Sequence, residues 1–321
     1  MDLEAVDFSL QPIINIHSGR YFGCEAFIRN TDQLGFASIP AFFDAIYEKP
    51  NFLELTGRVW ERALQKFQEV PLEDKGKLFL NLDSRIIEHE QEILNITRDL
   101  SRRYQIPPDS LGFEISEKRS MRTVDELKNI ITGYSSQGYR VILEHFGTDS
   151  SDFNILFHYH PDYLKLDRAF ISNIVHDERR KIVAANIIRL SNALGIKVIA
   201  TGIESGDEFL LCREIGCDLL QGYYIQDPTT RVGEIRGDYK RVFQAIAFDD
   251  DRLDTRIIDR HMEFIEPIYQ DTDITDVLDK FRDNQERTFF PVVDHNDMPV
   301  GLIVEDRART WKPATKTATR P

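Results

Sequence analysis

Cysteine is scarce in this sequence, and the three cysteines present do not form a C-x-x-C pair. Cys24, Cys212 and Cys217 are odd in number, which argues against a disulfide framework and favours small packing residues in a reduced compartment. Long apolar runs are also absent, since no stretch approaches the roughly 18 residues of a membrane span. The N-terminus lacks the basic-then-apolar pattern of a signal peptide. We therefore expect a cytoplasmic protein without a membrane span.

Positive charge is in the minority, with 40 lysine and arginine residues against 54 acidic residues and a net charge of −14. This balance argues against a broad basic face, so we expect no nucleic acid polymer as a partner. A few local lysines or arginines can still bind a small anionic ligand. The chain does have 41% hydrophobic residues over 321 positions, which is enough for one barrel of about 250 residues plus a smaller unit.

Short apolar runs recur along the chain, and most of them end in a carboxylate, a carboxamide or a lysine. They lie at residues 24–27, 78–81, 112–115, 141–144, 163–167, 198–201 and 219–221. Stretches with helical periodicity separate most of these runs, so the sequence predicts a mainly parallel sheet closed into a (β/α)8 barrel of the TIM type. Residues 8–16 and 21–29 form a predicted hairpin, which makes the first strand antiparallel to the rest.

The pattern of helices and strands also divides the chain. Helices are expected at residues 40–49, 53–68, 84–104, 124–137, 176–195 and 208–215. Beyond these, a long charged helix is expected from residue 233 to about 266, followed by a helix at 274–284 and strands at 288–294 and 299–304. We therefore expect a barrel over residues 1–245, a helical connector over 246–266, a small α/β unit over 267–309 and a disordered tail over 310–321.

Four of the polar side chains at strand ends offer oxygen atoms, namely Glu25, Asn81, Glu114 and Glu144. The C-terminal ends of barrel strands converge on one face, so these groups should share a pocket. Carboxylate and amide oxygens suit a hard cation such as Mg²⁺ or Mn²⁺. The alternative is ordinary strand-end polarity, which explains any single residue well but the regular series poorly.

Seven short motifs follow one another along the chain at regular places. They are Gln11-Pro12-Ile13-Ile14, Glu25-Ala26-Phe27-Ile28-Arg29, Leu80-Asn81-Leu82, Glu114-Ile115-Ser116-Glu117, Phe146-Gly147-Thr148, Lys165-Leu166-Asp167 and Gln221-Gly222-Tyr223-Tyr224. In this order and spacing they resemble the motifs of the EAL domain, the cyclic di-GMP phosphodiesterase or receptor module of bacteria. The resemblance covers roughly residues 5 to 245 and implies cyclic di-GMP as the ligand.

The resemblance also implies roles for individual residues. Mg²⁺ or Mn²⁺ beside the scissile phosphate would be bound by the four oxygen-bearing residues named above, and Lys165 would hold the attacking water and stabilise charge on the phosphoryl group. The dinucleotide would be contacted by Gln11, Arg29, Lys165 and Gln221. Arginine suits a phosphate because its planar fork can bind two oxygens. Glu117 would anchor the loop that follows the strand of Glu144.

At several positions the chain departs from the EAL pattern. Glu144-His145 replaces two aspartates, and the longer glutamate alters a geometry to which Mg²⁺ is sensitive. His145 can ligate a softer metal such as Zn²⁺, or it is only a substituted side chain at a relaxed site. Thr201 replaces a glutamate that the family needs for catalysis, and Glu204 remains as a vestige of that motif. Asp149 replaces a glycine and adds negative charge near the anion site. These replacements weigh against a filled metal site.

Three functions remain open from the sequence. We expect a degenerate EAL domain that binds cyclic di-GMP without hydrolysing it and passes the bound state to its C-terminal region or to an unknown downstream protein. The alternatives are a weak metal-dependent cyclic di-GMP phosphodiesterase and a protein-interaction domain that no longer binds nucleotide. Residues 266–309 resemble the first half of a CBS-domain pair, with Asp271-Thr272-Asp273-Ile274 as the helix entry. An incomplete unit of this kind exposes apolar surface, so we expect a homodimer.

Overall fold

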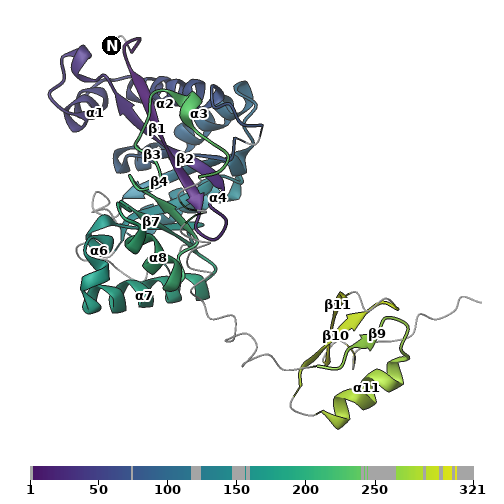
Figure 1. Cartoon of the computed structure of the whole chain (residues 1–321). Coiled ribbons are helices and arrows are strands. Elements are labelled where there is room, and N and C mark those ends of the chain that lie inside the picture. The colour runs from purple at the N-terminus through teal and green to yellow at the C-terminus, as the bar shows by residue number, and fades with distance from the viewer. Residues whose placement is uncertain are drawn as a thin grey trace, which may run out of the picture. The chain divides into compact units, whose positions relative to one another are not determined.

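The computed structural model describes residues 3–73, 75–116, 124–146, 156, 160–239, 242, 244, 265–284, 287–295, 299–305 and 308. The side chains of residues 84, 87, 88, 116, 124–127 and 145 lie outside this description. The chain forms two compact units, Met1–Arg252 and Leu253–Pro321, which are considered separately below (Figure 1). Residues 246–264 of the connector expected over 246–266 and the whole tail expected over 310–321 fall outside the described residues.

Eight strands of the first unit close into a barrel in chain order. They are β1 (Asp7–Asn15), β2 (Tyr21–Arg29), β3 (Lys77–Leu82), β4 (Leu111–Ser116), β5 (Arg140–Phe146), β6 (Tyr163–Leu166), β7 (Lys197–Thr201) and β8 (Leu219–Gln221). β1 pairs antiparallel with both of its neighbours, β2 and β8, whereas the pairs from β2 to β8 are parallel. The predicted barrel with an antiparallel first strand is confirmed.

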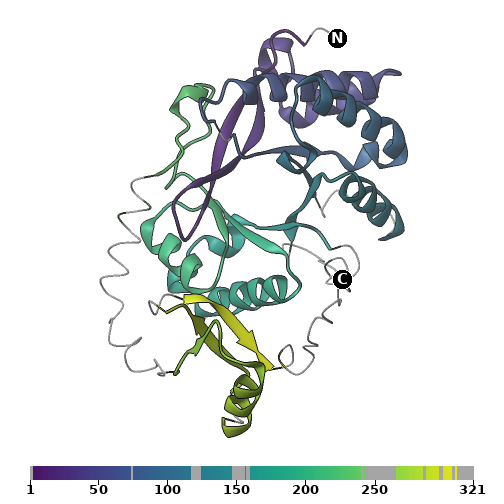
Figure 2. The ribbon, with the colours of Figure 1, turned by 90° about the vertical axis from the view of Figure 1, so that its right-hand side faces the viewer.

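Helices connect the parallel strands and lie outside the barrel (Figures 1 and 2). They are α1 (Ile39–Tyr47), α2 (Phe52–Gln68), α3 (Glu90–Arg103), α4 (Val124–Ser136), α6 (Arg168–Ile171), α7 (Glu178–Ala193) and α8 (Gly206–Glu214). Short 3-10 turns occur at Asp32–Leu34, Pro108–Ser110, Ile174–His176 and Val232–Glu234. None of the helices in the described part of the chain has the length and apolar character needed to cross a membrane.

Side-chain caps fix where several of these helices begin. Ser38 accepts a hydrogen bond from the backbone of Ala41 at α1, and Asp177 caps α7 in the same way. Ser205 and Glu208 form a reciprocal capping box at α8. The single helix expected over residues 84–104 is wrong in its first part, because Ser84–His89 is a 3-10 turn. There the Asp83 side chain caps the backbone at Arg85, and α3 begins only at Glu90.

The barrel interior is filled by a small apolar cluster drawn from six strands. Its buried members are Ile13, Phe79, Ile142, Tyr163, Ile199 and Leu219. The rings of Phe79 and Tyr163 meet edge to face with centroids 5.7 Å apart, an arrangement that aromatic pairs favour. A larger cluster, which includes Trp60 and Tyr134, packs the helices against the outside of the sheet. The filled interior leaves the strand ends as the place where polar side chains can gather.

The long helix expected from residue 233 is wrong at its start. Val232–Glu234 is a 3-10 turn, and residues 235–239 are not helical. This segment returns to the first hairpin, where the backbone N–H of Tyr21 donates to the carbonyl of Gly237 at 3.0 Å and Arg20 pairs with Asp238. The backbone groups are satisfied by the hairpin turn at Gly19 and Arg20 and by the first residue of β2, a long-range pairing that local periodicity does not reveal.

The second unit contains three strands and one helix. β9 (Ile268–Tyr269) pairs parallel with β10 (Phe289–Val293), which pairs antiparallel with β11 (Pro299–Val304). α11 (Ile274–Asp283) buries Val277 and Phe281 in a small core that also contains Ile268, Phe290 and Ala308. The expected helix and hairpin are therefore present at residues 274–304, while the resemblance to a CBS domain stays a prediction.

The close approach of β2 and β3 gives a test of the barrel. A Cβ atom added at Gly23 would lie 2.4 Å from the carbonyl oxygen of Lys77 on the neighbouring strand, so the backbones must separate. We expect Gly23→Ala to lower the free energy of unfolding by about 1–3 kcal/mol, measured by urea denaturation with the fluorescence of buried Trp60. Gly233→Ala is the matched control, because an added Cβ there meets nothing within 4 Å. Equal midpoints for the two variants would contradict this packing.

Candidate functional site

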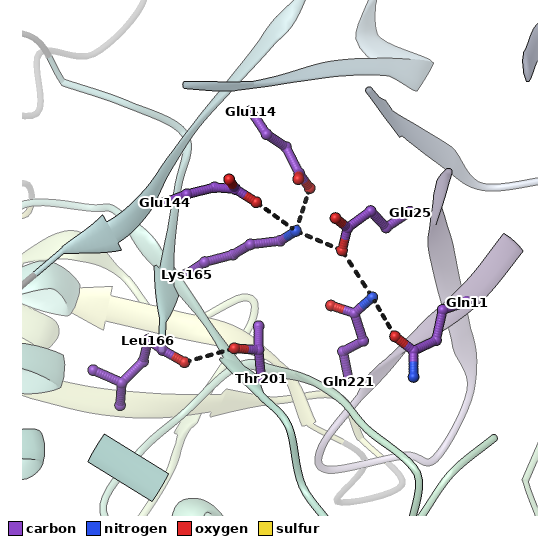
Figure 3. A network of polar contacts seen from close by, with 8 residues as sticks. All are labelled: Gln11, Glu25, Glu114, Glu144, Lys165, Leu166, Thr201 and Gln221. Carbon is purple, nitrogen blue, oxygen red and sulfur yellow. Dashed lines mark hydrogen bonds and ion pairs between the residues drawn. The ribbon is translucent and has the colours of Figure 1, made fainter. Parts of the chain in front are cut away.

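Polar side chains from seven of the eight strands meet at one end of the barrel (Figure 3). They are Gln11 on β1, Glu25 on β2, Glu114 on β4, Glu144 on β5, Lys165 on β6, Thr201 on β7 and Gln221 on β8. The strand register brings them to one level, since Gln11 lies opposite Glu25 and Thr201 lies opposite Gln221. Six of these side chains form one connected network, and Thr201 lies beside it.

Lys165 is the centre of this network. Its Nζ lies 2.5 Å from Oε1 of Glu114, 2.7 Å from Oε2 of Glu25 and 3.3 Å from Oε1 of Glu144. The lysine side chain is 6% exposed and the Glu114 side chain is fully buried. Buried charges are costly unless they are paired, and this ammonium group is the positive partner of all three carboxyl groups.

Burial and neighbouring charges both shift the pKa values of the groups in this cluster. Burial acts to lower the pKa of Lys165, but the charges of Glu114, Glu25 and Glu144 outweigh it and raise that pKa above its usual value. Burial raises the pKa of Glu114 well above the usual carboxyl range, and the charge of Glu25 adds to the effect. The lysine therefore stays protonated, while Glu114 is the carboxyl group that burial favours in its neutral form.

Two glutamine amides extend the network from the carboxylates towards β1. Nε2 of Gln221 donates to Oε2 of Glu25 at 2.9 Å and to Oε1 of Gln11 at 3.1 Å. Nε2 of Gln11 in turn donates to the backbone carbonyl of Gln226 at 3.1 Å. Both glutamines are buried, so these bonds fix their orientation.

Two cavities adjoin the network and share the side chains of Glu25, Phe27 and Glu144. The more polar one has a volume of about 480 Å³ and is lined by polar side chains that include Gln11, Lys165, Arg168, Thr201, Glu204 and Gln221. The other has a volume of about 430 Å³ and contains mostly apolar and aromatic groups, among them Phe43, Tyr47 and Trp60, together with Asn81 and Glu114. A ligand with charged and flat apolar parts suits this combination.

Three carboxylates in the network fit a metal ion. Glu25, Glu114 and Glu144 each offer an oxygen, and these oxygens lie within 4.8 Å of one another. Metal–oxygen distances of about 2.0–2.6 Å allow one divalent cation to contact all three. The same three carboxylates already hold the ammonium group of Lys165, so a cation must share them with it. The donor set therefore fits one cation beside Lys165.

Other predicted site residues lie at the edge of this cluster. Asn81 is exposed and lines the apolar cavity. Oγ1 of Thr201 donates to the backbone carbonyl of Leu166 at 3.0 Å, so its hydroxyl is engaged with the backbone. Glu204 forms an ion pair with Arg168, which lowers the pKa of the Glu204 carboxyl below its usual value. Glu117, Asp149 and the side chain of His145 lie outside the described residues.

Arg29 does not appear among the described residues that line either cavity. Its Nη1 donates to the carbonyl of Ile28 at 2.9 Å, and its guanidinium lies 5.7 Å from the ring centroid of Phe27. Burial lowers the pKa of Arg29 from its usual value, and Tyr223 acts in the opposite direction. Phe27 and Tyr223 both line the polar cavity, so Arg29 is next to its wall.

Sequence reasoning missed two features of this region. Arg168 lines the polar cavity, although only its place directly after the Lys165-Leu166-Asp167 motif hinted at such a position. The apolar cavity was also missed, because α1 and α2 contribute side chains such as Phe43 and Trp60 that local periodicity assigns to an ordinary core. In both cases the residues reach the site only when distant segments come together.

Residues 2–228 match the family model of the EAL domain. A cyclic di-GMP phosphodiesterase of Pseudomonas aeruginosa is 29% identical over 232 residues, which cover 70% of this chain and 38% of that protein. The chain spans between 27% and 38% of the length of the first three curated relatives that it matches.

Solved structures resemble the barrel as well. A standalone EAL protein from Vibrio cholerae, crystallised with cyclic di-GMP, is 27% identical with a TM-score of 0.59 and covers 70% of this chain and 92% of its own. BlrP1 of Klebsiella pneumoniae, in complex with manganese and cyclic di-GMP, has a TM-score of 0.65 over 73% of this chain and 59% of its own. At 23% identity, this second likeness indicates a shared fold.

The raised pKa of Glu114 predicts how the stability of the barrel depends on pH. In the folded protein the Glu114 carboxyl group keeps its proton to a higher pH than in the unfolded chain, where the carboxyl pKa is the ordinary 4.5. Ionised Glu114 therefore destabilises the fold increasingly as the pH rises above 4.5 and through its raised folded-state pKa. In EDTA, we expect Glu114→Gln to increase the free energy of unfolding at pH 8, and this gain should shrink towards pH 4.5.

Urea denaturation at several pH values measures the effect. Glu69→Gln is the control, because Glu69 is exposed and lies outside the network. A gain in stability that stays constant from pH 5 to pH 8 would contradict the role of the buried carboxyl group.

Proposed function

Because this chain belongs to the EAL domain family, we propose that its barrel binds cyclic di-GMP as a signalling module with little or no phosphodiesterase activity. Relatives that share the family fold are named as cyclic di-GMP phosphodiesterases or were crystallised with this dinucleotide. The bound state would pass to the C-terminal unit or to a downstream protein. A homodimer is part of the same proposal.

The main support is a contrast between two parts of the polar cavity. On one side, Gln11, Lys165 and Gln221 keep the residue types that the resemblance assigns to the dinucleotide, and all three line the cavity. On the other side, Thr201 stands where the family has a required glutamate, and its hydroxyl donates to the carbonyl of Leu166. A threonine cannot supply an anionic metal ligand or a base near neutral pH. Binding groups are therefore retained where a catalytic group is missing.

The position and lining of the two cavities also suit a dinucleotide. The polar and apolar cavities adjoin the same carboxylates, so phosphates can lie near Lys165 while a flat base contacts groups such as Tyr47 and Trp60. Lys165 would attract a phosphate only weakly, since three carboxylates already neutralise the charge of its ammonium group. We therefore expect binding that depends on several contacts, none of them dominant.

Hydrolysis makes stricter demands on the same site. Glu25, Asn81, Glu114 and Glu144 would hold a metal ion, which when bound polarises the phosphoryl oxygens and lowers the pKa of a nearby water. Lys165 would orient that water through its ammonium group. The loss of one metal-site carboxylate typically costs several kcal/mol of transition-state stabilisation, and each 1.36 kcal/mol is tenfold in rate. With a threonine at 201, the rate of hydrolysis should be low.

A weak metal-dependent phosphodiesterase is the second candidate function. It is favoured by the three carboxylate oxygens that lie within 4.8 Å of one another. An interaction domain that has lost the nucleotide is the third candidate. The first two functions differ in whether the linear dinucleotide is formed.

The first test is hydrolysis in Mg²⁺ or Mn²⁺, followed by chromatography of the linear dinucleotide. The unmodified chain should form little or none. The triple variant Glu144→Asp, His145→Asp, Thr201→Glu should hydrolyse cyclic di-GMP at least tenfold faster, because it restores the three acidic residues of the EAL pattern. Adding Glu25→Gln to the triple variant is the control and should abolish the gain. Rapid turnover by the unmodified chain would refute the non-catalytic proposal.

The second test is isothermal titration with cyclic di-GMP, with Mg²⁺ and with EDTA. A hydrogen bond to a charged group contributes about 1.5–3 kcal/mol, so Arg29→Ala should weaken binding by roughly ten- to a hundredfold. Arg189→Ala removes the same charge from an exposed position on α7 and should leave the affinity unchanged. If the unmodified chain shows no heat and no protection at high micromolar ligand, the interaction-only function replaces the binding proposal.

A further inference from the structure

The polar cavity is acidic, although its proposed ligand is an anion. Among the described residues that line it, Glu25, Glu144, Asp167 and Glu204 carry carboxylates, whereas Lys165 and Arg168 carry positive charge. An anionic ligand that enters this cavity meets more negative than positive side chains. It therefore needs a cation that is not already neutralised.

Lys165 and Arg168 differ in their exposure and in the number of carboxylates with which each is paired. The Lys165 ammonium is buried between three carboxylates at 2.5–3.3 Å, and its side chain is only 6% exposed. The Arg168 side chain is 49% exposed and forms an ion pair with a single carboxylate, that of Glu204, which is 42% exposed. Within the described lining of the cavity, Arg168 is thus the cation that a dissolved anion can reach.

The backbone around Arg168 holds the stem of its side chain in place. Asp167 caps the start of α6 by accepting from the backbone N–H of Ala169 at 2.8 Å. Gly202 has a φ of +73°, and a Cβ added there would lie 2.9 Å from both Cβ and Cγ of Arg168. The arginine stem therefore lies directly over a glycine at the end of β7. Nη1 of Arg168 also donates to the carbonyl of Gly202 at 3.3 Å, so a change of carboxylate partner does not require the backbone to move.

Glu204 is held beside the cavity in a similar way. Its backbone N–H donates to Oε2 of Glu208 at 2.8 Å, and the same carboxylate accepts from the backbone of Ser205 at the capping box of α8. These bonds fix the backbone of Glu204, and its side chain takes no part in them. The carboxylate is therefore presented to Arg168 by a rigid helix start.

We propose that Arg168 is a phosphate-binding residue of the polar cavity and that Glu204 is a built-in competitor which the ligand must displace from it. This inference rests on the proposed binding of cyclic di-GMP. An exposed ion pair contributes little net stability, because both groups are well hydrated when they separate. A phosphodiester can replace the carboxylate with a charge-assisted contact to the same guanidinium fork.

The competitor gives the two residues opposite effects on affinity. Loss of Arg168 removes a phosphate contact and weakens binding. Loss of the negative charge on Glu204 frees Arg168 and tightens binding, even though Glu204 itself need not touch the ligand. If the ion pair had only a structural role, both substitutions would change the affinity in the same direction, because either one breaks the same ion pair.

Titration with cyclic di-GMP in EDTA tests the inference on the full chain. We expect Arg168→Ala to weaken binding by about ten- to a hundredfold and Glu204→Gln to tighten it by roughly three- to tenfold. In the double variant, Glu204→Gln should have no further effect, because its action passes through Arg168. Glu214→Gln is the matched control, since Glu214 forms an exposed ion pair with Lys181 at 3.2 Å and does not line the described part of the cavity.

The outcomes separate this inference from the proposed function. If the unmodified chain binds and Glu204→Gln binds equally or more weakly, the competitor role is overturned while the binding function stands. If Arg168→Ala binds as tightly as the unmodified chain, the phosphate-binding role is overturned in the same way. If only Glu204→Gln binds, the competitor role holds and the unmodified chain is not a receptor. Absence of binding by all of these chains overturns both.

Discussion

The ammonium group of Lys165 holds together carboxylates from three other strands of the barrel. Glu25, Glu114 and Glu144 would repel one another in a buried space, and the lysine at 2.5–3.3 Å from each offsets this repulsion. Gln221 and Gln11 are oriented in turn by the carboxylate of Glu25 and by each other. The arrangement of the whole polar end of the barrel thus depends on one positive charge.

This dependence links metal binding and anion binding. A divalent cation among the three carboxylates would share their charge with Lys165 and leave the lysine freer to meet a phosphate. Without such a cation, Lys165 is largely neutralised and the exposed pair of Arg168 and Glu204 becomes the more accessible charge in the described part of the cavity.

Strand positions were predictable from the sequence wherever the signal was local. Tyr21–Arg29, Leu219–Gln221 and Pro299–Val304 have the bounds that apolar runs and turn signals predicted. The helix expected from residue 233 failed because Gly237 and Asp238 pair with the first hairpin, more than 200 residues away along the chain. The 3-10 turn at Ser84–His89 was missed because a side-chain cap at Asp83 competes with helical periodicity.

The barrel and the polar residues at the strand ends could be predicted from the sequence, because they follow from residue type and spacing along one strand at a time. The replacements at Glu144, His145 and Thr201 could be read from the resemblance to the EAL domain. Three contacts became visible only in the folded chain: Lys165 is shared by three carboxylates, Thr201 bonds to a backbone carbonyl, and Arg168 meets Glu204. Such partners lie on different strands and loops, and the distances between them are set by closure of the barrel rather than by local sequence.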